Sequence, residues 1–232
     1  MNICVFGASG PVGRAVVTQA LGAGHQVTAV TRRPDRFALS GPRLRVVTGD
    51  VLDLPQVETC VEGADAVISV IGVNPSRGPI TTYSEGIGNV MAAMRAQGIS
   101  RIACVSSKAL TEGGTRHEPI VYRLLVARLL AAVNRSLYDD MRRMEALVRK
   151  SELDWTIVRP AGLYAAARVS TYRCTTAEEP GVFSSTADVA DALIREVTGE
   201  RPHIGAVVQV LTDEETPPYL VLLARQASLH RR

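Results

Sequence analysis

The sequence predicts an α/β protein built on a doubly wound parallel sheet with a small substrate lobe, and three observations support this prediction. Apolar runs of strand length alternate with segments of helical periodicity along most of the chain. A glycine-rich turn joins the first apolar run, residues 3–6, to the first helical segment. There is no internal repeat and no linker of biased composition. We therefore expect a single domain over residues 1–232, with substrate-lining segments at about 107–135 and 160–185.

Composition places the chain among ordinary globular proteins. At 232 residues, with 46% hydrophobic and 21% charged residues, it is long enough to bury a sizeable core and too apolar to be disordered. A net charge of +3 is too small to indicate nucleic acid as a partner. The four cysteines lie far apart, so we expect them to pack rather than to bind a metal. No basic-then-apolar leader precedes the first strand, which predicts a cytoplasmic protein.

The turn between the first strand and the first helix, residues 7–13, reads GASGPVG. The amino terminus of a helix binds phosphate, because its first N–H groups lack partners and the positive end of the helix dipole lies there. Side chains at Gly7 and Gly10 would block a ligand, a Cβ at Gly13 would push the helix off the strand, and Pro11 suits the first helical position. The spacing is G-x-x-G-x-x-G rather than G-x-G-x-x-G. A purely structural turn is the alternative, but the position between strand and helix favours a phosphate-bearing ligand.

The second predicted strand, residues 26–31, ends in Thr31-Arg32-Arg33. In a dinucleotide-binding fold the end of this strand meets the adenosine ribose, where an acidic residue binds the 2′-OH of NAD. Two guanidinium groups in place of that carboxylate favour a 2′-phosphate, because arginine binds phosphate through charge-assisted, often bidentate hydrogen bonds. The sequence therefore predicts NADP(H) as the ligand, with a solvated surface pair of arginines as the alternative.

The third predicted strand, residues 44–48, is followed by Asp50 and by a short helix over about 55–61. The carboxyl end of this strand faces the adenine in such a fold, so the Asp50 carboxylate is a candidate to accept from the exocyclic amine. An aspartate that caps a helix or a turn has the same sequence signature. Both interpretations remain open for this residue.

The apolar run at 64–72 predicts a central strand buried on both faces. Its end, Ile71 and Gly72, is expected under the nicotinamide half of the ligand. The fifth strand, residues 101–106, delivers Ser106 to the same edge of the sheet, where ligands bind in open α/β sheets.

Three more segments have helical character. Residues 83–94 carry apolar side chains on one helical face. Residues 120–133 are apolar on nearly every side but, at about 14 residues, too short to span a bilayer. We expect this segment to cover the active site, pack in a dimer or touch a membrane surface. A helix over 136–150 places Tyr138 and Arg142 on one face, four residues apart.

The last part of the chain is predicted to hold a sixth strand at 154–158, a loop-rich segment at 160–185, a helix ending near 197 and a seventh strand at 206–211. The tail after residue 213 contains an apolar patch followed by basic residues, and the sequence assigns it no purpose.

Seven segments together carry a resemblance to a known family: GASGPVG at 7–13, TRRP at 31–34, TGDV at 48–51, CVSS at 104–107, YDDMRRMEALV at 138–148, LDWTIVRPAGL at 153–163 and STADVADALI at 185–194. The chain resembles the atypical short-chain dehydrogenase/reductases, in particular the NAD(P)H-binding group related to flavin reductase/biliverdin-IXβ reductase and to NmrA-like proteins. This resemblance implies a Rossmann fold that binds NADP(H). The implied cofactor contacts are Gly7, Ser9, Gly10, Pro11, Val12 and Gly13 on the phosphates, Thr31, Arg32 and Arg33 at the 2′-phosphate, Asp50 and Val51 along the adenine, and Ile71, Gly72, Ser106 and Pro160 at the nicotinamide end.

The family's usual Tyr-x-x-x-Lys dyad is absent. Tyr122 is followed at the fourth place by Val126, and Tyr138 by Arg142. In the dyad, lysine lowers the tyrosine pKa so that the phenol passes a proton as hydride moves. Arginine would keep the positive field but lose the compact ammonium geometry. We predict Tyr138 as an acid assisted by Arg142 and Ser106, with a helix-surface tyrosine of no chemical role as the alternative.

The expected function is an NADPH-dependent reductase of a conjugated small molecule such as a quinone, flavin or ketone. Flavin and biliverdin reductases of this group also lack the dyad, and Ser106 matches their serine; Lys108 is a second candidate, to steer an anionic substrate. The alternative is an NADP-binding regulator or sensor of the NmrA-like kind, and a redox-neutral reaction is a third possibility. Expected partners are a small-molecule substrate and no nucleic acid, with no membrane span, in a monomer or homodimer.

Overall fold

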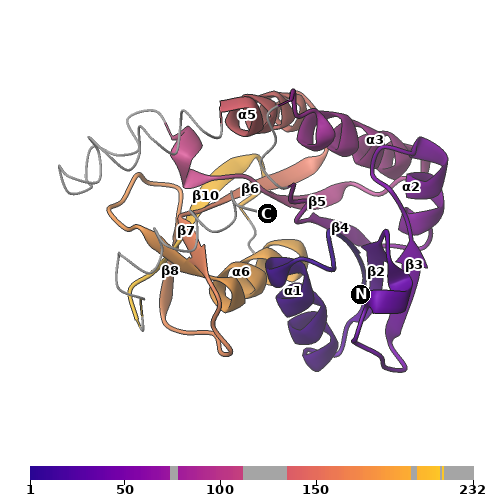
Figure 1. The fold of residues 1–232 in the computed structure, drawn as a ribbon, viewed down its shortest axis with the longest axis horizontal. Helices are drawn as coiled ribbons and strands as arrows, with labels where there is room; N and C mark the ends of the chain where they lie inside the picture. The colour runs from indigo at the N-terminus through magenta and orange to yellow at the C-terminus, as the bar shows by residue number, and fades with distance from the viewer. Residues whose placement is uncertain (74–77, 112–134, 200–202, 215, 217–232) are drawn as a thin grey trace.

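The computed structural model describes residues 1–73, 78–111, 135–199, 203–214 and 216. Within these residues a central eight-stranded sheet carries helices on both faces (Figure 1). The strand order is β3-β2-β1-β4-β5-β6-β10-β8. The strands are β1 (Asn2–Phe6), β2 (Gln26–Thr31), β3 (Leu44–Thr48), β4 (Ala66–Ser69), β5 (Arg101–Val105), β6 (Asp154–Pro160), β8 (Tyr172–Thr175) and β10 (Ala206–Thr212).

The sheet is parallel except at one edge, where β8 runs antiparallel to β10. From β1 the chain first builds outward through β2 and β3, then returns to the other side of β1 with β4, β5 and β6. The strand order therefore reverses between β1 and β4. In doubly wound sheets a crevice opens at this reversal, outside the carboxyl ends of the strands, and ligands bind there.

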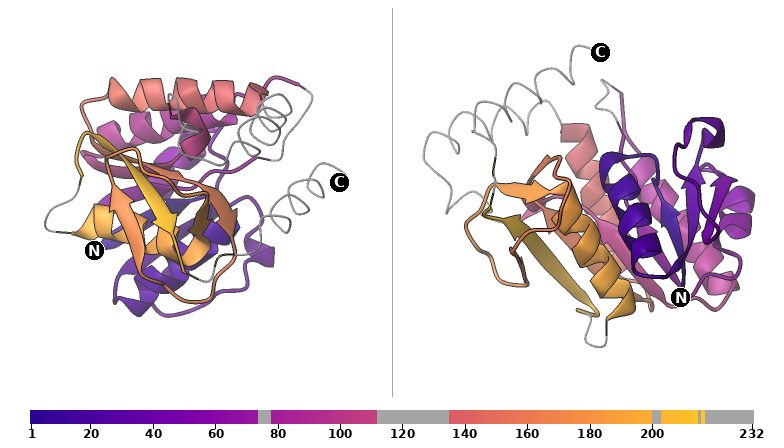
Figure 2. Two further views of the ribbon diagram at one scale, coloured as in Figure 1. Left: turned by 90° about the vertical axis from the view of Figure 1, so that its left-hand side faces the viewer. Right: turned by 90° about the horizontal axis from the view of Figure 1, so that it is seen from below.

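Two layers of helices cover the sheet (Figure 2). Helices α1 (Pro11–Gly22) and α6 (Thr186–Thr198) pack against each other on one face. Helices α2 (Leu54–Val61), α3 (Thr82–Ala96) and α5 (Arg135–Arg149) cover the other face. Alternate residues of β1 pack against the two helix layers, because successive side chains of a strand point to opposite faces.

The two faces have separate apolar cores. The core beneath α1 and α6 includes Ile3 and Val5, whereas the core beneath α2, α3 and α5 includes Cys4 and Phe6. All four side chains are at most 1% exposed. The expected packing role of Cys4 agrees with this position.

Capping residues set where the helices begin. The Asp53 carboxylate accepts from Gln56 N at 3.2 Å at the start of α2, and Ser185 Oγ accepts from Asp188 N at 3.0 Å at the start of α6. The fully buried Asp140 of α5 accepts from Tyr83 N of α3 at 2.8 Å. Each bond satisfies a backbone N–H that the helix itself leaves without a partner.

The predicted fold class is confirmed, and the segment at 160–185 is where sequence and structure differ. It was expected to be loop-rich, but it contains β8 of the main sheet and a separate parallel pair, β7 (Gly162–Tyr164) and β9 (Phe183–Ser185). These strands are three or four residues long, too short for an alternating pattern to show. Two short 3₁₀ turns, η1 (Pro34–Arg36) and η2 (Lys108–Leu110), were also not predicted.

The β7–β9 pair has a small apolar cluster of its own, in which Tyr164 and Phe183 meet edge to face with ring centroids 6.1 Å apart. The apolar segment 120–133, with Tyr122 and Val126, and residues 217–232 of the tail lie outside the described residues. In the part of the chain that the structure describes, every helix is too short or too polar to cross a bilayer.

Candidate functional site

The glycine turn after β1 packs so closely that two of its glycines are required by the protein itself. Gly7 has φ +82°, and a Cβ there would lie 2.5 Å from the carbonyl oxygen of Val70. A Cβ on Gly13 would lie 2.7 Å from the Cα of Ala8. At Gly10 the nearest atom would be 3.4 Å away, so the protein leaves room for a side chain. The predicted need for glycine at position 10 therefore depends on the ligand alone.

The amino terminus of α1 has the features of a phosphate site. Gly10 occupies the cap position, and its carbonyl accepts from Arg14 N at 2.9 Å. No side chain caps the first turn, and Pro11 stands at its start. The amides of this turn, including those of Val12 and Gly13, lack intrahelical acceptors, as in every α-helix. The cradle therefore fits a diphosphate, which accepts from such amides and is stabilised by the helix dipole.

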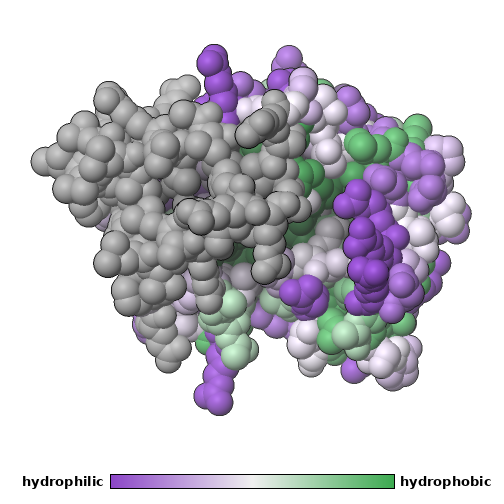
Figure 3. All heavy atoms as spheres, in the orientation of Figure 1, coloured by the Kyte–Doolittle hydropathy of each residue, from purple (hydrophilic) through white to green (hydrophobic). Residues whose placement is uncertain are grey.

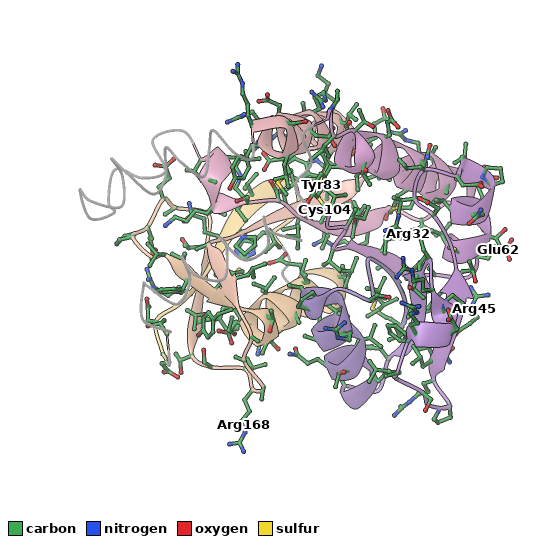
Figure 4. The ribbon with its side chains drawn as sticks, viewed as in Figure 1. Arg32, Arg45, Glu62, Tyr83, Cys104 and Arg168 are labelled. Carbon is green, nitrogen blue, oxygen red and sulfur yellow. The ribbon has the colours of Figure 1, made fainter. Side chains whose placement is uncertain are left out.

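The end of β2 is bonded to this turn. Ser9 Oγ lies 2.6 Å from Thr31 Oγ1, and the backbone N–H of Arg33 donates to the same Thr31 oxygen at 3.1 Å. Arg32 and Arg33 are exposed, and Figure 4 shows Arg32 beside the end of β2. Neither guanidinium bonds another residue within the described part of the chain, so both are available to an anion. Hydrophilic side chains gather over this side of the molecule, next to apolar side chains at the centre of the same face (Figure 3).

Asp50 forms a turn in this structure. Its carboxylate Oδ1 accepts from Leu52 N at 3.0 Å, and its own N–H donates to Gln56 Oε1 at 3.1 Å. The helix cap at α2 is Asp53 instead. Oδ2 of Asp50 makes no bond with the described residues, and its contact with adenine stays a prediction.

Val51 and Ile71 come together beside α3. A Cβ built on Gly86 would meet Val51 Cγ2 at 2.9 Å and Ile71 Cδ1 at 3.5 Å. The Val51 carbonyl accepts from Asn89 Nδ2 at 2.8 Å, which fixes this loop on the helix. Gly72 follows Ile71 and is exposed.

Ser106 stands at the end of β5 with a hydroxyl that makes no hydrogen bond with any described residue. Its backbone N–H continues the ladder to Val158 O at 2.9 Å, and the residue is 4% exposed. The Oγ atom is buried and unpartnered. Unpaired buried polar atoms are rare in proteins and frequently mark functional positions. Pro160, the other residue expected at the nicotinamide end, is buried at the end of β6.

A buried ion pair lies next to Ser106, and sequence reasoning missed it. Both oxygens of Glu145 accept from Arg159, at 2.9 Å from Nε and 2.6 Å from Nη2. Burial alone would raise the pKa of Glu145, but the Arg159 guanidinium and the charge of Arg149 together lower it below its usual value. Val105 pairs with Val158 in the register of β5 and β6, so Arg159 lies beside Ser106 on the neighbouring strand, but the Ser106 hydroxyl makes no hydrogen bond with the ion pair. The segments YDDMRRMEALV and LDWTIVRPAGL contain these residues, but nothing in them shows that they pair.

The predicted assistance of Tyr138 by Arg142 is not seen. Arg142 bonds Asp139 at 2.8 Å on the outer side of α5, and its side chain is 58% exposed. Tyr138 is half-buried, and burial raises its pKa, whereas the dyad requires a lowered one. A surface ion pair three residues apart is the simplest arrangement for Arg142. The catalytic roles of Tyr138 and Arg142 stay predictions.

Lys108 is a structural anchor in this arrangement. It is buried, and its Nζ donates to the carbonyl oxygens of Glu179 at 2.9 Å and Gly181 at 2.6 Å. These bonds tie the loop before β9 to the end of β5. Lys108 is thus a buried residue rather than a solvated loop lysine, and its candidate role in steering an anionic substrate stays a prediction.

At another place in the fold, potential metal ligands of Cys174, Glu196 and His203 lie within 4.8 Å of one another. The Glu196 carboxylate is already engaged, because Oε1 lies 2.7 Å from His203 Nδ1 and the guanidinium of Arg101 lies 3.5 Å from Oε2. A cation bound here would be repelled by Arg101 at close range. We therefore assign this cluster to the packing of α6 against the sheet.

Comparisons with known proteins agree with this geometry. The chain spans only 13% of the length of three mycobacterial relatives, to which it is 33% identical over 126 residues, 54% of its own length. It is 30% identical over 158 residues to (4-alkanoyl-5-oxo-2,5-dihydrofuran-3-yl)methyl phosphate reductase of Streptomyces griseus, covering 68% of this chain and 46% of the reductase.

Two solved structures share the fold at lower identity. A short-chain dehydrogenase/reductase from Veillonella parvula in complex with NADP has a TM-score of 0.75 at 18% identity, over 92% of this chain and 95% of that one. ChuY, an anaerobillin reductase from Escherichia coli O157:H7, has a TM-score of 0.73 at 23% identity, over 94% of this chain and all of that one. Both likenesses confirm the Rossmann fold that the sequence resemblance implied.

A family model described as NAD(P)H-binding matches residues 7–200, which include the glycine turn, the end of β2 and Ser106. The cradle at α1 fits the diphosphate of such a cofactor. The chain belongs to the NAD(P)H-binding family of Rossmann-fold proteins.

Proposed function

We propose that this chain is an NADPH-dependent reductase that transfers hydride to a conjugated small molecule, such as a quinone, a flavin or a ketone. Its family and the reductases among its relatives support an NAD(P)H-dependent reductase in general. The substrate class and the preference for the phosphorylated dinucleotide are our own inferences from the site.

In this proposal each part of the cofactor is assigned to the glycine turn or to the end of a strand. The α1 amides would hold the diphosphate, and Arg32 with Arg33 would hold the 2′-phosphate by charge-assisted bonds. Asp50 and Val51 would lie along the adenine. Bound NADPH supplies a hydride from its nicotinamide ring.

The observation that carries the reductase proposal is the buried, unpartnered hydroxyl of Ser106 at the carboxyl edge of the sheet. A polar atom left without a partner in the protein is suited to a ligand that supplies one. Ser106 would orient the acceptor or the nicotinamide, with Ile71, Gly72 and Pro160 around it. Hydride and one proton, from water or from a hydroxyl such as that of Tyr138, complete the two-electron reduction of the acceptor.

The segments at about 107–135 and 160–185 are proposed to line the substrate side of a single domain. The described part of the second segment includes the β7–β9 pair and the loop that Lys108 anchors. β7 follows β6, and Lys108 follows β5; the carboxyl ends of β5 and β6 belong to the proposed site, which supports this assignment.

The experiment is to mix the purified protein with NADPH and a panel of quinones, flavins and ketones, following the loss of nicotinamide absorbance. At least one acceptor should oxidise NADPH. The S106A variant should lower that rate by about 10-fold or more, a typical share for one oriented polar group. The matched control is S100A, since Ser100 is exposed just before β5, at the opposite end of the same strand. Equal rates for S106A and the wild type would contradict the proposal.

A second candidate is an NADP-binding regulator or sensor. The observation that favours it is the position of Arg142, which pairs with Asp139 rather than with Tyr138, so a working dyad is missing. Tight NADPH binding, with no turnover of any acceptor in the panel, would support the sensor.

A further inference from the structure

A second buried polar atom without a partner lies in the same part of the sheet as Ser106. Gln209 interrupts the apolar run of β10 and is 5% exposed. Its amide oxygen, Oε1, makes no hydrogen bond with any residue that the structure describes. Among those residues, this atom and Ser106 Oγ are the two buried side-chain atoms left unpaired. Because such atoms are rare, their occurrence in one place asks for a common explanation.

The register of the strands places Ser106 and Gln209 on either side of Arg159. Gln209 of β10 is the direct neighbour of Arg159 on β6. Val105 pairs with Val158, so Ser106 is the neighbour of Arg159 on the other side, and its backbone N–H donates to Val158 O at 2.9 Å. Ser106, Arg159 and Gln209 therefore lie side by side across β5, β6 and β10, and we call them the polar row.

The side chains of the polar row point to one face of the sheet. Cys104, Ile157 and Val207, each two residues earlier along the chain, belong to or pack against the core beneath α2, α3 and α5. Side chains two residues apart on a strand share a face, so the polar row faces the same helix layer. The ion pair between Arg159 and Glu145 of α5 agrees with this direction.

The charge in the middle of the polar row is balanced within the protein. Both oxygens of Glu145 accept from Arg159, and Arg159 Nη1 donates to Thr111 Oγ1 at 3.3 Å. An anion bound beside this pair would lose its hydration without meeting a free cation, which is costly in a buried site. The polar row therefore suits an uncharged ligand group.

The two unpaired atoms define the chemistry of that group. The Gln209 oxygen can only accept, so the ligand must supply an N–H or O–H, whereas the Ser106 hydroxyl can also donate. A carboxamide offers both an N–H and a carbonyl oxygen, but a carboxylate has no proton to donate. Two strand spacings separate the backbones of Ser106 and Gln209 by roughly 10 Å. Two hydrogen bonds of about 3 Å each leave room between the side chains for one such group.

We propose that Gln209 is a substrate-binding residue, which together with Ser106 holds an uncharged amide-type group, a carbonyl next to an N–H, on the acceptor that is reduced. This inference rests on the proposed function and narrows it to uncharged acceptors that carry such a group. It also explains why a polar side chain interrupts an otherwise apolar strand.

The test compares 2-naphthamide with 2-naphthoate, two unreactive compounds that share a ring system, of which only the amide has N–H donors and only the carboxylate is charged. Calorimetric titration measures their affinities for the NADP⁺-loaded protein. The wild type should bind the amide about 5-fold or more tightly than the carboxylate. Q209M, which keeps an unbranched side chain, should weaken amide binding by about 3- to 10-fold and carboxylate binding by less than about 2-fold.

The matched control is Q97M, because Gln97 is exposed at the carboxyl end of α3, and this variant should change neither affinity. Thermal unfolding gives a second measurement. Methionine removes a buried amide oxygen that has no partner, so Q209M should melt at the temperature of the wild type or above it. A glutamine that only holds a buried water would give a lower melting temperature and an unchanged amide affinity. If Q209M does not fold, Q209L replaces it with the same expectations.

A wild type that binds neither compound, or both equally, overturns this inference, and so does an unchanged amide affinity in Q209M. Weaker binding of NADPH in place of the amide would assign Gln209 to the cofactor and overturn it as well. A wild type that binds no NADPH overturns the proposed function together with this inference. NADPH binding and turnover of an acceptor, without the amide preference, overturn this inference alone and leave the reductase in place.

Discussion

The Ser9 hydroxyl lies 2.6 Å from the Thr31 hydroxyl, which joins the glycine turn to the end of β2. Thr31 is 7% exposed and also accepts from the backbone N–H of Arg33. The part of the site that fits a diphosphate and the part that carries the two arginines are therefore held together by the protein itself. A dinucleotide that spans both parts meets a site already in position, which lowers the entropic cost of binding.

Replacing Thr31 by valine keeps the shape of the side chain and removes both bonds. Ser9 and Arg33 are exposed and can bond water instead, so the loss of these two bonds should lower the free energy of unfolding by about 0.5–1.5 kcal/mol for each bond. NADPH affinity should also fall. Denaturant unfolding and fluorescence titration measure the two effects. Thr48, the partner of Thr31 in the β2–β3 register, is exposed, and T48V is the control that should change neither.

The double variant R32A/R33A tests the choice of dinucleotide. Because only NADPH carries the 2′-phosphate, we expect affinity for NADPH to fall by about 10-fold or more, while affinity for NADH changes little. Calorimetric titration with both nucleotides measures this. R95A removes an exposed arginine in the last turn of α3 and should affect neither affinity. Equal losses for the two nucleotides would refute the assignment of these arginines.

A pair of helical glycines tests the close approach of α1 to the turn. G13A forces a Cβ against Ala8 and should destabilise the protein by about 1–3 kcal/mol. G88A lies in α3, where a Cβ meets nothing within 4 Å, and should stabilise the helix by up to about 1 kcal/mol. Thermal and denaturant unfolding give both values. Similar effects at both sites would contradict the packing described here.

The Glu145–Arg159 pair should make the free energy of unfolding depend on pH in the acidic range. The folded pKa of Glu145 lies below its ordinary value of 4.5, so the stabilisation is complete above that value and is lost as pH falls through the folded pKa. The melting temperature of the wild type should exceed that of E145Q near neutral pH, and the gap should close at more acidic pH. A gap that stays constant down to the folded pKa would show that the charge of Glu145 is not responsible.

Much of the core fold and of the cofactor site follows from the sequence. Residues 7–13 already indicate a turn between strand and helix, and Arg32 and Arg33 stand at a strand end with no carboxylate beside them. Residues 160–185 do not reveal β8, because an antiparallel edge strand of four residues depends on its neighbour β10 rather than on its own pattern. Nor does the sequence show that Lys108 bonds the loop before β9, or that Arg142 pairs with Asp139.

The sequence by itself determined which segments become strands and helices and where the chain must turn on glycine, because periodicity and backbone conformation are local properties. Only the tertiary structure decided that Glu145 meets Arg159 beside an unpartnered Ser106. That meeting depends on how α5 packs on β5 and β6. Burial then sets the hydrogen bonds and the pKa of each group, and the local sequence does not show which polar groups are buried together.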